Sequence, residues 1–154
     1  MTLLEQHRVE MQVLHMLNET ASFINENFPG VKKIGLLSTT GTRKVKVYQQ
    51  ILEPKGYTVI EVPEEKQAEL HDSIYNPTWG IKGAEPDIQR ARYNFLHYIR
   101  LLKEQGAEVV ILGCTEIPLA LPEKKTEGVP LINPMVALAR ALVRNANPAK
   151  LKPL

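Results

Sequence analysis

The stretch that decides the fold is Val109-Val110-Ile111-Leu112-Gly113-Cys114-Thr115-Glu116-Ile117-Pro118. Its first four residues are apolar and mostly β-branched, which is typical of a strand buried in a parallel sheet. A glycine, a thiol, a hydroxyl and a carboxylate follow, and then a segment that can start a helix. In open α/β folds the residues directly after a strand lie at the carboxyl edge of the sheet, where ligands bind. The stretch therefore predicts a functional edge at Cys114.

Three other short apolar runs predict strands, centred near residues 33, 58 and 131. Apolar residues at spacings of three and four predict the helices between and around them, over residues 3–27, 43–52, 64–74, 87–105, 117–121 and 133–145. Strands that alternate with helices favour a parallel sheet. We therefore expect an α/β fold with a four-stranded parallel sheet in a three-layer, flavodoxin-like arrangement.

Proline and glycine divide the chain into three parts. Pro29-Gly30 ends the first predicted helix, so residues 1–29 form an N-terminal linking helix. Residues 30–146 form the α/β lobe, and residues 147–154 a loose tail. The 154 residues are enough for one domain with a substantial core.

Composition excludes several classes of function. The net charge of +2 gives no case for nucleic acid or an anionic membrane as partner. No apolar run approaches the ~18 residues of a membrane span, and no signal peptide is visible at the N-terminus. A single cysteine cannot form an internal disulfide, which favours the cytoplasm. His7, His15, His71 and His97 show no metal-ligand spacing with Cys114, so we expect no metal.

Cys114 is the first candidate for chemistry. A thiolate at a helix N-terminus is stabilised by the helix dipole, which lowers the thiol pKa, and such a group can attack an electrophile or move a proton. Glu116 would oppose thiolate formation if its charge pointed inward. The alternative is a small residue that only packs beneath the next helix, because free cysteine is among the most buried residue types.

Two further segments could bind an anion. Thr39-Thr40-Gly41-Thr42 follows the first strand of the lobe, and its hydroxyl and N–H groups suit a carboxylate or phosphate. The same residues also make an ordinary N-cap without any ligand. Lys82 lies in a loop bounded by glycines, where it could reach a substrate carboxylate or stay solvated. Neither the Walker nor the Rossmann glycine pattern is present, so a nucleotide has little support.

Three motifs resemble the second half of the aspartate/glutamate racemase family. They are Ile34-Gly35-Leu36-Leu37-Ser38-Thr39-Thr40-Gly41-Thr42, Trp79-Gly80-Ile81-Lys82 and Ile111-Leu112-Gly113-Cys114-Thr115-Glu116-Ile117-Pro118-Leu119. The resemblance covers roughly residues 30 to 145. Glutamate after Cys-Thr, where glutamate racemases usually have histidine, is more similar to the aspartate racemase branch.

The resemblance implies a cofactor-independent enzyme with two similar lobes, each of which supplies one catalytic cysteine. One thiolate removes the substrate α-proton and the other thiol returns a proton to the opposite face. Cys114 would be the acid/base of the second lobe. Thr115 would donate to the substrate carboxylate through its side chain or backbone, and Glu116 would also belong to the substrate-binding residues. Thr39, Thr40, Gly41 and Thr42 would contact a small acidic amino acid, and Lys82 would pair with its carboxylate. Asn133 stands where many relatives have aspartate.

The first-lobe motifs of that family are missing from this chain. The resemblance therefore implies a C-terminal fragment or the product of a truncated gene, which needs the missing N-terminal lobe for activity. A bare apolar surface also favours a homodimer. Two alternatives stay open: a non-catalytic binding or interaction module that kept the fold, and a related enzyme of the hydantoin racemase or maleate isomerase type.

Overall fold

The computed structural model of the chain describes residues 12–154. Within these residues a five-stranded sheet has the order β2-β1-β3-β5-β4. Four of its strands run parallel, which confirms the predicted parallel sheet: β1 (Lys33–Leu37), β2 (Thr58–Glu61), β3 (Val109–Leu112) and β5 (Val129–Ile132). The fifth strand, β4 (Lys125–Thr126), pairs antiparallel with β5 at the edge. Two residues are too short to show an alternating pattern, so the sequence did not predict β4.

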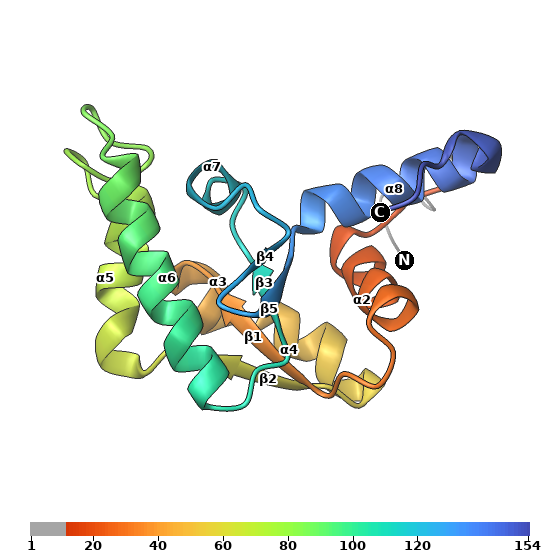
Figure 1. Cartoon of the computed structure of the whole chain (residues 1–154), viewed down its shortest axis with the longest axis horizontal. Helices are drawn as coiled ribbons and strands as arrows, with labels where there is room; N and C mark the ends of the chain where they lie inside the picture. Colours follow the sequence, from red (N-terminus) through yellow and green to blue (C-terminus); the bar gives the residue numbers. More distant parts are fainter. Residues whose placement is uncertain (1–11) are drawn as a thin grey trace, which may run out of the picture.

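Helices cover both faces of the sheet and complete the three-layer α/β/α arrangement (Figure 1). On one face Phe95 and Leu102 pack with Val110 of β3 in a continuous core. On the other face Ile24 packs with Ile111, the next residue of the same strand. The helices of the first face are α5 (Glu64–Tyr75) and α6 (Ile88–Glu104), and those of the second are α2 (Met16–Asn27) and α4 (Val47–Leu52). Both faces of β3 are buried, and this is why all four of its residues are apolar.

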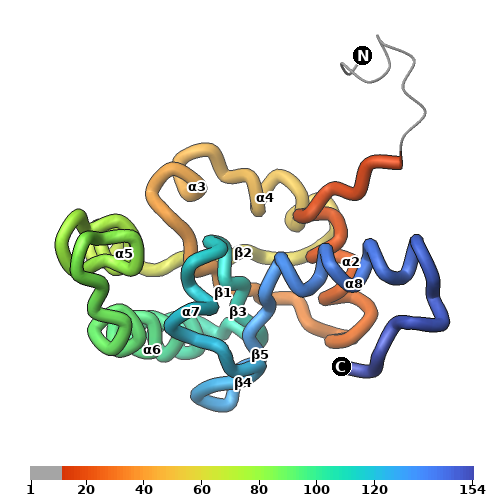
Figure 2. The backbone as a smooth tube through the Cα atoms, turned by 90° about the horizontal axis from the view of Figure 1, so that it is seen from above, coloured from red at the N-terminus to blue at the C-terminus, as the bar shows by residue number. Residues whose placement is uncertain are grey.

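The last long helix, α8 (Pro134–Ala146), packs along α2 (Figure 2). Arg144 joins the two helices, because its guanidinium lies 3.0 Å from the carboxylate of Glu19 and 3.3 Å from that of Glu26. The opposite side of α8 leaves four large apolar side chains exposed: Met135, Val136, Leu142 and Val143. This side of the helix is therefore only partly covered by the described residues.

Two predicted helices differ from the observed ones. The helix expected over residues 3–27 begins at Met16, because residues 12–15 are not helical and His15 has an extended backbone; residues 3–11 lie outside the described part. The helix expected over residues 43–52 starts earlier, as α3 (Thr40–Val45), and is separated from α4 by Lys46. Lys46 has a left-handed backbone with φ of 54°, which ends the first helical segment.

Short 3-10 turns follow two of the helices. The first is η1 (Glu53–Lys55), which ends at Gly56 before β2. The second is η2 (Pro148–Lys150), which lies within residues 147–154, the segment expected to be a loose tail. No helix within residues 12–154 is both long and apolar enough to cross a membrane.

The strand order places the ends of β1 and β3 side by side. From β1 the chain moves outward to β2 and then returns to the other side of β1 for β3. Such a reversal opens a crevice at the carboxyl ends of the two inner strands. Leu37 pairs with Leu112 at these ends, and the Gly113 N–H donates to the Leu37 carbonyl at 2.7 Å. The loops after β1 and β3 therefore leave the sheet together.

Candidate active site

Gly113 fixes the approach of the two loops. A Cβ atom at this position would lie 2.8 Å from the Leu37 carbonyl oxygen and 2.8 Å from Leu36 Cδ1. Any other residue would therefore push the end of β3 away from the end of β1. The glycine lets Cys114 start its turn directly against Ser38, and α7 (Ile117–Ala120) begins three residues later.

The three polar residues of this turn interact with one another. The Cys114 thiol donates to Glu116 Oε2 at 2.9 Å, and the Thr115 hydroxyl donates to the same oxygen at 2.8 Å. Glu116 therefore points inward, toward the thiol. Cys114 is half-buried, whereas Thr115 is exposed at the rim.

These contacts reverse the pKa shift that the sequence predicted for the thiol. Burial and the hydrogen bond to Glu116 raise the pKa of Cys114 from 9.0 to about 11, although Lys82 opposes the shift. The helix that follows is only four residues long, so its dipole cannot outweigh these effects. Glu116 shows the opposite change: hydrogen bonds from Cys114, Thr115 and Lys82 lower its pKa from 4.5 to about 2. The resting site therefore holds a neutral thiol beside a carboxylate.

Lys82 reaches this turn from a tightly folded loop after α5. The Asn76 side chain accepts hydrogen bonds from the backbone N–H groups of Thr78 and Trp79, which starts the loop. The Lys82 N–H then donates to the Ile74 carbonyl at 2.9 Å and returns the chain to the end of α5. A Cβ at Gly80 would lie 2.5 Å from the Asn76 nitrogen, so this position must be glycine. The loop is a rigid support for the lysine.

The Lys82 side chain joins the loop to the Cys114 turn. Its Nζ lies 3.2 Å from Glu116 Oε1 and 4.9 Å from the centre of the Tyr75 ring. The ring of Tyr75 stacks on that of His71, one turn earlier in α5, with 5.1 Å between centres. His71 Nδ1 in turn accepts a long hydrogen bond, 3.4 Å, from the Thr40 N–H. Contacts therefore run continuously from the threonine-rich turn to Cys114.

The threonine-rich turn is an N-cap. The Thr39 side chain accepts from the Thr42 N–H at 3.5 Å, and the hydroxyls of these two residues lie 3.2 Å apart. Thr40, Gly41 and Thr42 already belong to the first turn of α3, which the sequence predicted to begin at Arg43. Thr39 therefore caps the helix, which was the alternative to ligand binding. The Thr40 N–H is already hydrogen-bonded to His71. Gly41 is exposed, and the side chains of the three threonines are partly exposed beside it at the edge of the sheet.

Buried hydrogen bonds connect this turn to α5 and to the end of β2. Gln67 of α5 donates to the Ser38 carbonyl at 3.0 Å. Its own carbonyl accepts from the Arg43 guanidinium at 3.1 Å, and Arg43 also donates to the Val62 carbonyl at 2.7 Å. Groups that would otherwise be unpaired in the interior are therefore satisfied, and the turn is tied to α5.

A small cavity of about 40 Å³ adjoins Cys114, and Lys82 is not among the residues that line it. Tyr48 of α4 lines it, and burial, with a smaller effect from Cys114, raises the Tyr48 pKa to about 12. Asn133 also lines it, but its side chain accepts from the Met135 N–H at 3.0 Å and so caps α8. The remaining lining residues are Met16, Leu112, Gly113, Thr115, Pro134 and Met135.

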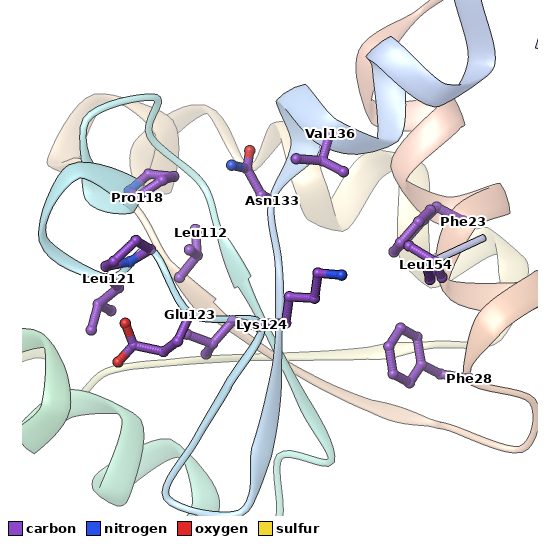
Figure 3. A pocket seen from close by; sticks show the side chains of 12 residues that line it. Phe23, Phe28, Leu112, Pro118, Leu121, Glu123, Lys124, Asn133, Val136 and Leu154 are labelled. Carbon is purple, nitrogen blue, oxygen red and sulfur yellow. The ribbon is translucent and has the colours of Figure 1, made fainter. Parts of the chain in front are cut away.

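A larger cavity, of about 260 Å³, lies between α2, α8 and the segment after α7 (Figure 3). Phe23, Phe28 and Leu154 line one side of it, and Pro118 and Leu121 the other. Its walls are mostly apolar and it does not include Cys114. We assign the candidate active site to the Cys114 edge, because a thiol, a carboxylate and an ammonium group meet there.

Sequence reasoning missed His71, Tyr75 and Tyr48. His71 and Tyr75 are four residues apart on a predicted helix, which is the spacing that places two side chains on one face. That signal was present, but only the fold shows that this face turns toward Thr40 and Lys82. Among residues 12–154 there is no cluster of three His, Cys, Asp or Glu side chains that could hold a metal ion.

Comparisons with known proteins agree with this architecture. A protein described only by its place in the pnlA 3' region, from Pectobacterium carotovorum subsp. carotovorum, is 32% identical over 121 residues, which cover 78% of this chain and 73% of that protein. The crystal structure of an aspartate racemase homologue from Pyrococcus horikoshii OT3 matches with a TM-score of 0.72 and 27% identity over 92% of this chain. Picrophilus torridus aspartate racemase matches with a TM-score of 0.68 and 28% identity over 86% of this chain.

The chain is shorter than both solved proteins. It covers 59% of the Pyrococcus chain and 52% of the Picrophilus chain. The sequence profile of the Asp/Glu/Hydantoin racemase family matches residues 4–142, which is most of the sequence. This match and the shared fold confirm the resemblance found in the three motifs. The chain belongs to the Asp/Glu/hydantoin racemase family.

Proposed function

We propose that the chain is the second lobe of a cofactor-independent racemase that acts on a small acidic amino acid, aspartate or glutamate. The observation that carries the proposal is the convergence of a thiol, a hydroxyl and an ammonium group on one carboxylate, that of Glu116. A site that holds a carboxylate beside a proton carrier has the parts needed to bind an amino acid and exchange its α-proton. Racemase relatives of the same fold support this assignment.

The roles of the side chains follow from their placement. Lys82 supplies the positive charge for the side-chain carboxylate of an acidic substrate, and the exposed Thr115 hydroxyl can donate to a substrate carboxylate. Thr39, Thr40, Gly41 and Thr42 would form the neighbouring wall. Cys114 gives up its proton when it acts as acid, and takes the α-proton as a thiolate when it acts as base. Because its thiol is neutral at rest, the acid role needs no prior ionisation.

A second proton carrier is required on the opposite face of the α-carbon, and Cys114 is the sole cysteine in the sequence. We propose that the missing N-terminal lobe supplies this carrier. Two groups held on either side of one carbon gain most of their rate from positioning, so one lobe alone would have negligible activity. A lone thiol that must stay reduced also suits the cytoplasm.

A second candidate function is a binding module that kept the fold and lost the chemistry. The raised pKa of Cys114 favours it, because the resting thiol is a weak nucleophile and base. A hydantoin racemase or maleate isomerase type of activity is a further alternative. The salt bridge between Lys82 and Glu116 favours an acidic ligand instead, because it shows that the edge accommodates a carboxylate beside a cation.

Substrate class and activity can be tested on the purified chain. We expect L-aspartate to bind more tightly than L-asparagine in calorimetric titration, and we expect this preference to disappear in Lys82→Met. We also expect no D-aspartate to form above the level of a Cys114→Ser control. Equal binding of the two amino acids would contradict an acidic substrate. Rapid racemisation that depends on Cys114 would contradict the need for a second lobe.

A further inference from the structure

Glu116 binds three polar groups that the candidate site offers to a substrate carboxylate. Its Oε2 accepts from the Cys114 thiol at 2.9 Å and from the Thr115 hydroxyl at 2.8 Å. Its Oε1 lies 3.2 Å from Lys82 Nζ. One protein carboxylate thus satisfies a thiol, a hydroxyl and an ammonium group at the same time. In this state a substrate carboxylate would compete with Glu116 for these three groups.

We propose that the Glu116 carboxylate is an internal ligand that occupies the anion site of Lys82, Thr115 and Cys114, and that a substrate carboxylate must displace it. The inference rests on the proposed function, because it takes Lys82 and Thr115 as the groups that bind an acidic substrate. It assigns Glu116 a positioning role, since this residue acts through the thiol and the lysine.

The cation stays in place when Glu116 leaves. The backbone N–H of Lys82 is bound to the Ile74 carbonyl, and its Nζ lies over the Tyr75 ring. A substrate carboxylate therefore meets a lysine that is already held at the edge. Two carboxylates beside one ammonium repel each other, so the arrival of the second displaces the first.

Glu116 has a short path into solvent. It directly precedes α7, and 19% of its side chain is already exposed. Thr115 beside it is exposed at the rim, and 44% of the Lys82 side chain is accessible. Rotation about the side-chain bonds of Glu116 can therefore move the carboxylate from the site to water without a change in the backbone.

Loss of the Glu116 charge would also change the pKa of the Cys114 thiol. The titratable groups that face Cys114 are Glu116 on its own turn, Lys82 from the loop after α5 and Tyr48 from α4. Of these, Glu116 holds the thiol proton through a hydrogen bond, and Lys82 favours the thiolate. In a chain without the Glu116 carboxylate and without a bound ligand, no carboxylate would hold the thiol proton, and Lys82 would favour the thiolate. Removal of the Glu116 charge should therefore lower the pKa of Cys114.

The test uses Glu116→Gln, Glu116→Asp and a matched control, Glu123→Gln. Glu123 is also a paired carboxylate, because Arg92 binds it, but it lies beyond α7 and does not contact Cys114. Succinate serves as the carboxylate probe in calorimetric titration. The pH dependence of alkylation by iodoacetamide, followed by mass spectrometry, reports ionisation of the thiol, and the modified residue is Cys114 because the chain has no other cysteine.

We expect Glu116→Gln to bind succinate at least about tenfold more tightly than the unmodified chain, and to lower the midpoint of thiol ionisation by about one pH unit or more. Glu116→Asp keeps the charge but shortens the reach, so it should give intermediate values. Glu123→Gln should change neither quantity. The inference is overturned if Glu116→Gln, or a folded Glu116→Asp in its place, binds succinate no more tightly than the unmodified chain, or if the midpoint does not move.

Neither measurement requires turnover. The absence of racemase activity would therefore leave this inference standing. Equally, a failure of Glu116→Gln to tighten succinate binding would leave the role of Cys114 as proton carrier to be judged by racemisation itself.

Discussion

The ammonium group of Lys82 lies 3.2 Å from the carboxylate of Glu116, although Lys82 belongs to the loop after α5 and Glu116 to the turn before α7. This ion pair joins the two loops that carry the candidate active site. It brings a cation to the carboxyl edge of the sheet. The Glu116 carboxylate connects this cation to the Cys114 thiol.

Replacement of Lys82 by methionine should change the acid stability of the fold. The folded-state pKa of Glu116, about 2, lies below its ordinary 4.5, so the carboxylate stabilises the fold above pH ~4.5 and loses this contribution as the pH falls toward 2. Lys82 contributes to that shift after Cys114 and Thr115. We therefore expect Lys82→Met to raise the pKa of Glu116, measured by carbon NMR of the carboxyl group, and to bring acid unfolding to a higher pH. Lys66→Met, at an exposed pair with Glu69, should alter neither.

The thiol should be protected from alkylation well into the alkaline range. Because its pKa rises from 9.0 to about 11, the fraction of thiolate at pH 8 is about 100-fold lower than for an ordinary cysteine. The rate of reaction with iodoacetamide should therefore climb with pH toward a midpoint near 11. The same chain unfolded in urea serves as the control and should show a midpoint near ~8.5. Equal midpoints for the folded and unfolded chains would contradict the environment described for Cys114.

Gly113→Ala should destabilise the fold by about 1–3 kcal/mol. The new Cβ would lie 2.8 Å from the Leu37 carbonyl oxygen and from Leu36 Cδ1, so the ends of β1 and β3 must separate. Gly41→Ala is the matched control, because a Cβ there meets nothing within 4 Å and alanine favours the helix in which Gly41 lies. Urea denaturation of both variants measures the difference. Similar stabilities would show that the two strand ends are not in tight contact.

The isolated chain should self-associate. Met135, Val136, Leu142 and Val143 form an exposed apolar side on α8, and water contact with such a surface is unfavourable. We expect a dimer by light scattering at high protein concentration. Val136→Glu with Leu142→Glu should restore the monomer without unfolding the chain, since both side chains are exposed. A monomeric mass for the unmodified chain at high concentration would disprove the prediction.

Much of this fold could be predicted from periodicity and turn residues. The buried run of β3 and the alternation of strands with helices identified the parallel sheet and the edge at which β1 and β3 end. The boundaries that failed lie where local geometry overrides periodicity. Lys46 adopts a left-handed backbone inside an apparently continuous helix, and β4 consists of two residues that pair only because β5 lies beside them.

The sequence indicates which residues belong to the candidate site. It does not indicate which of them contact one another. Cys114, Thr115, Glu116 and Lys82 were identified from their positions after strands and in a loop bounded by glycines. The direction of the Glu116 side chain decides whether the thiol pKa falls or rises, and sequence leaves that direction open. The roles of His71 and Tyr75 depend in the same way on which face of α5 meets the threonine-rich turn.

The central claim is that Cys114 moves the substrate α-proton once a first lobe stands opposite it. The most direct measurement is racemisation of L-aspartate by Picrophilus torridus aspartate racemase whose matching half has been replaced by residues 30–146 of this chain. We predict that the folded chimera produces D-aspartate and that Cys114→Ser abolishes this turnover. A folded chimera that produces no D-aspartate, or whose turnover survives Cys114→Ser, would contradict the account.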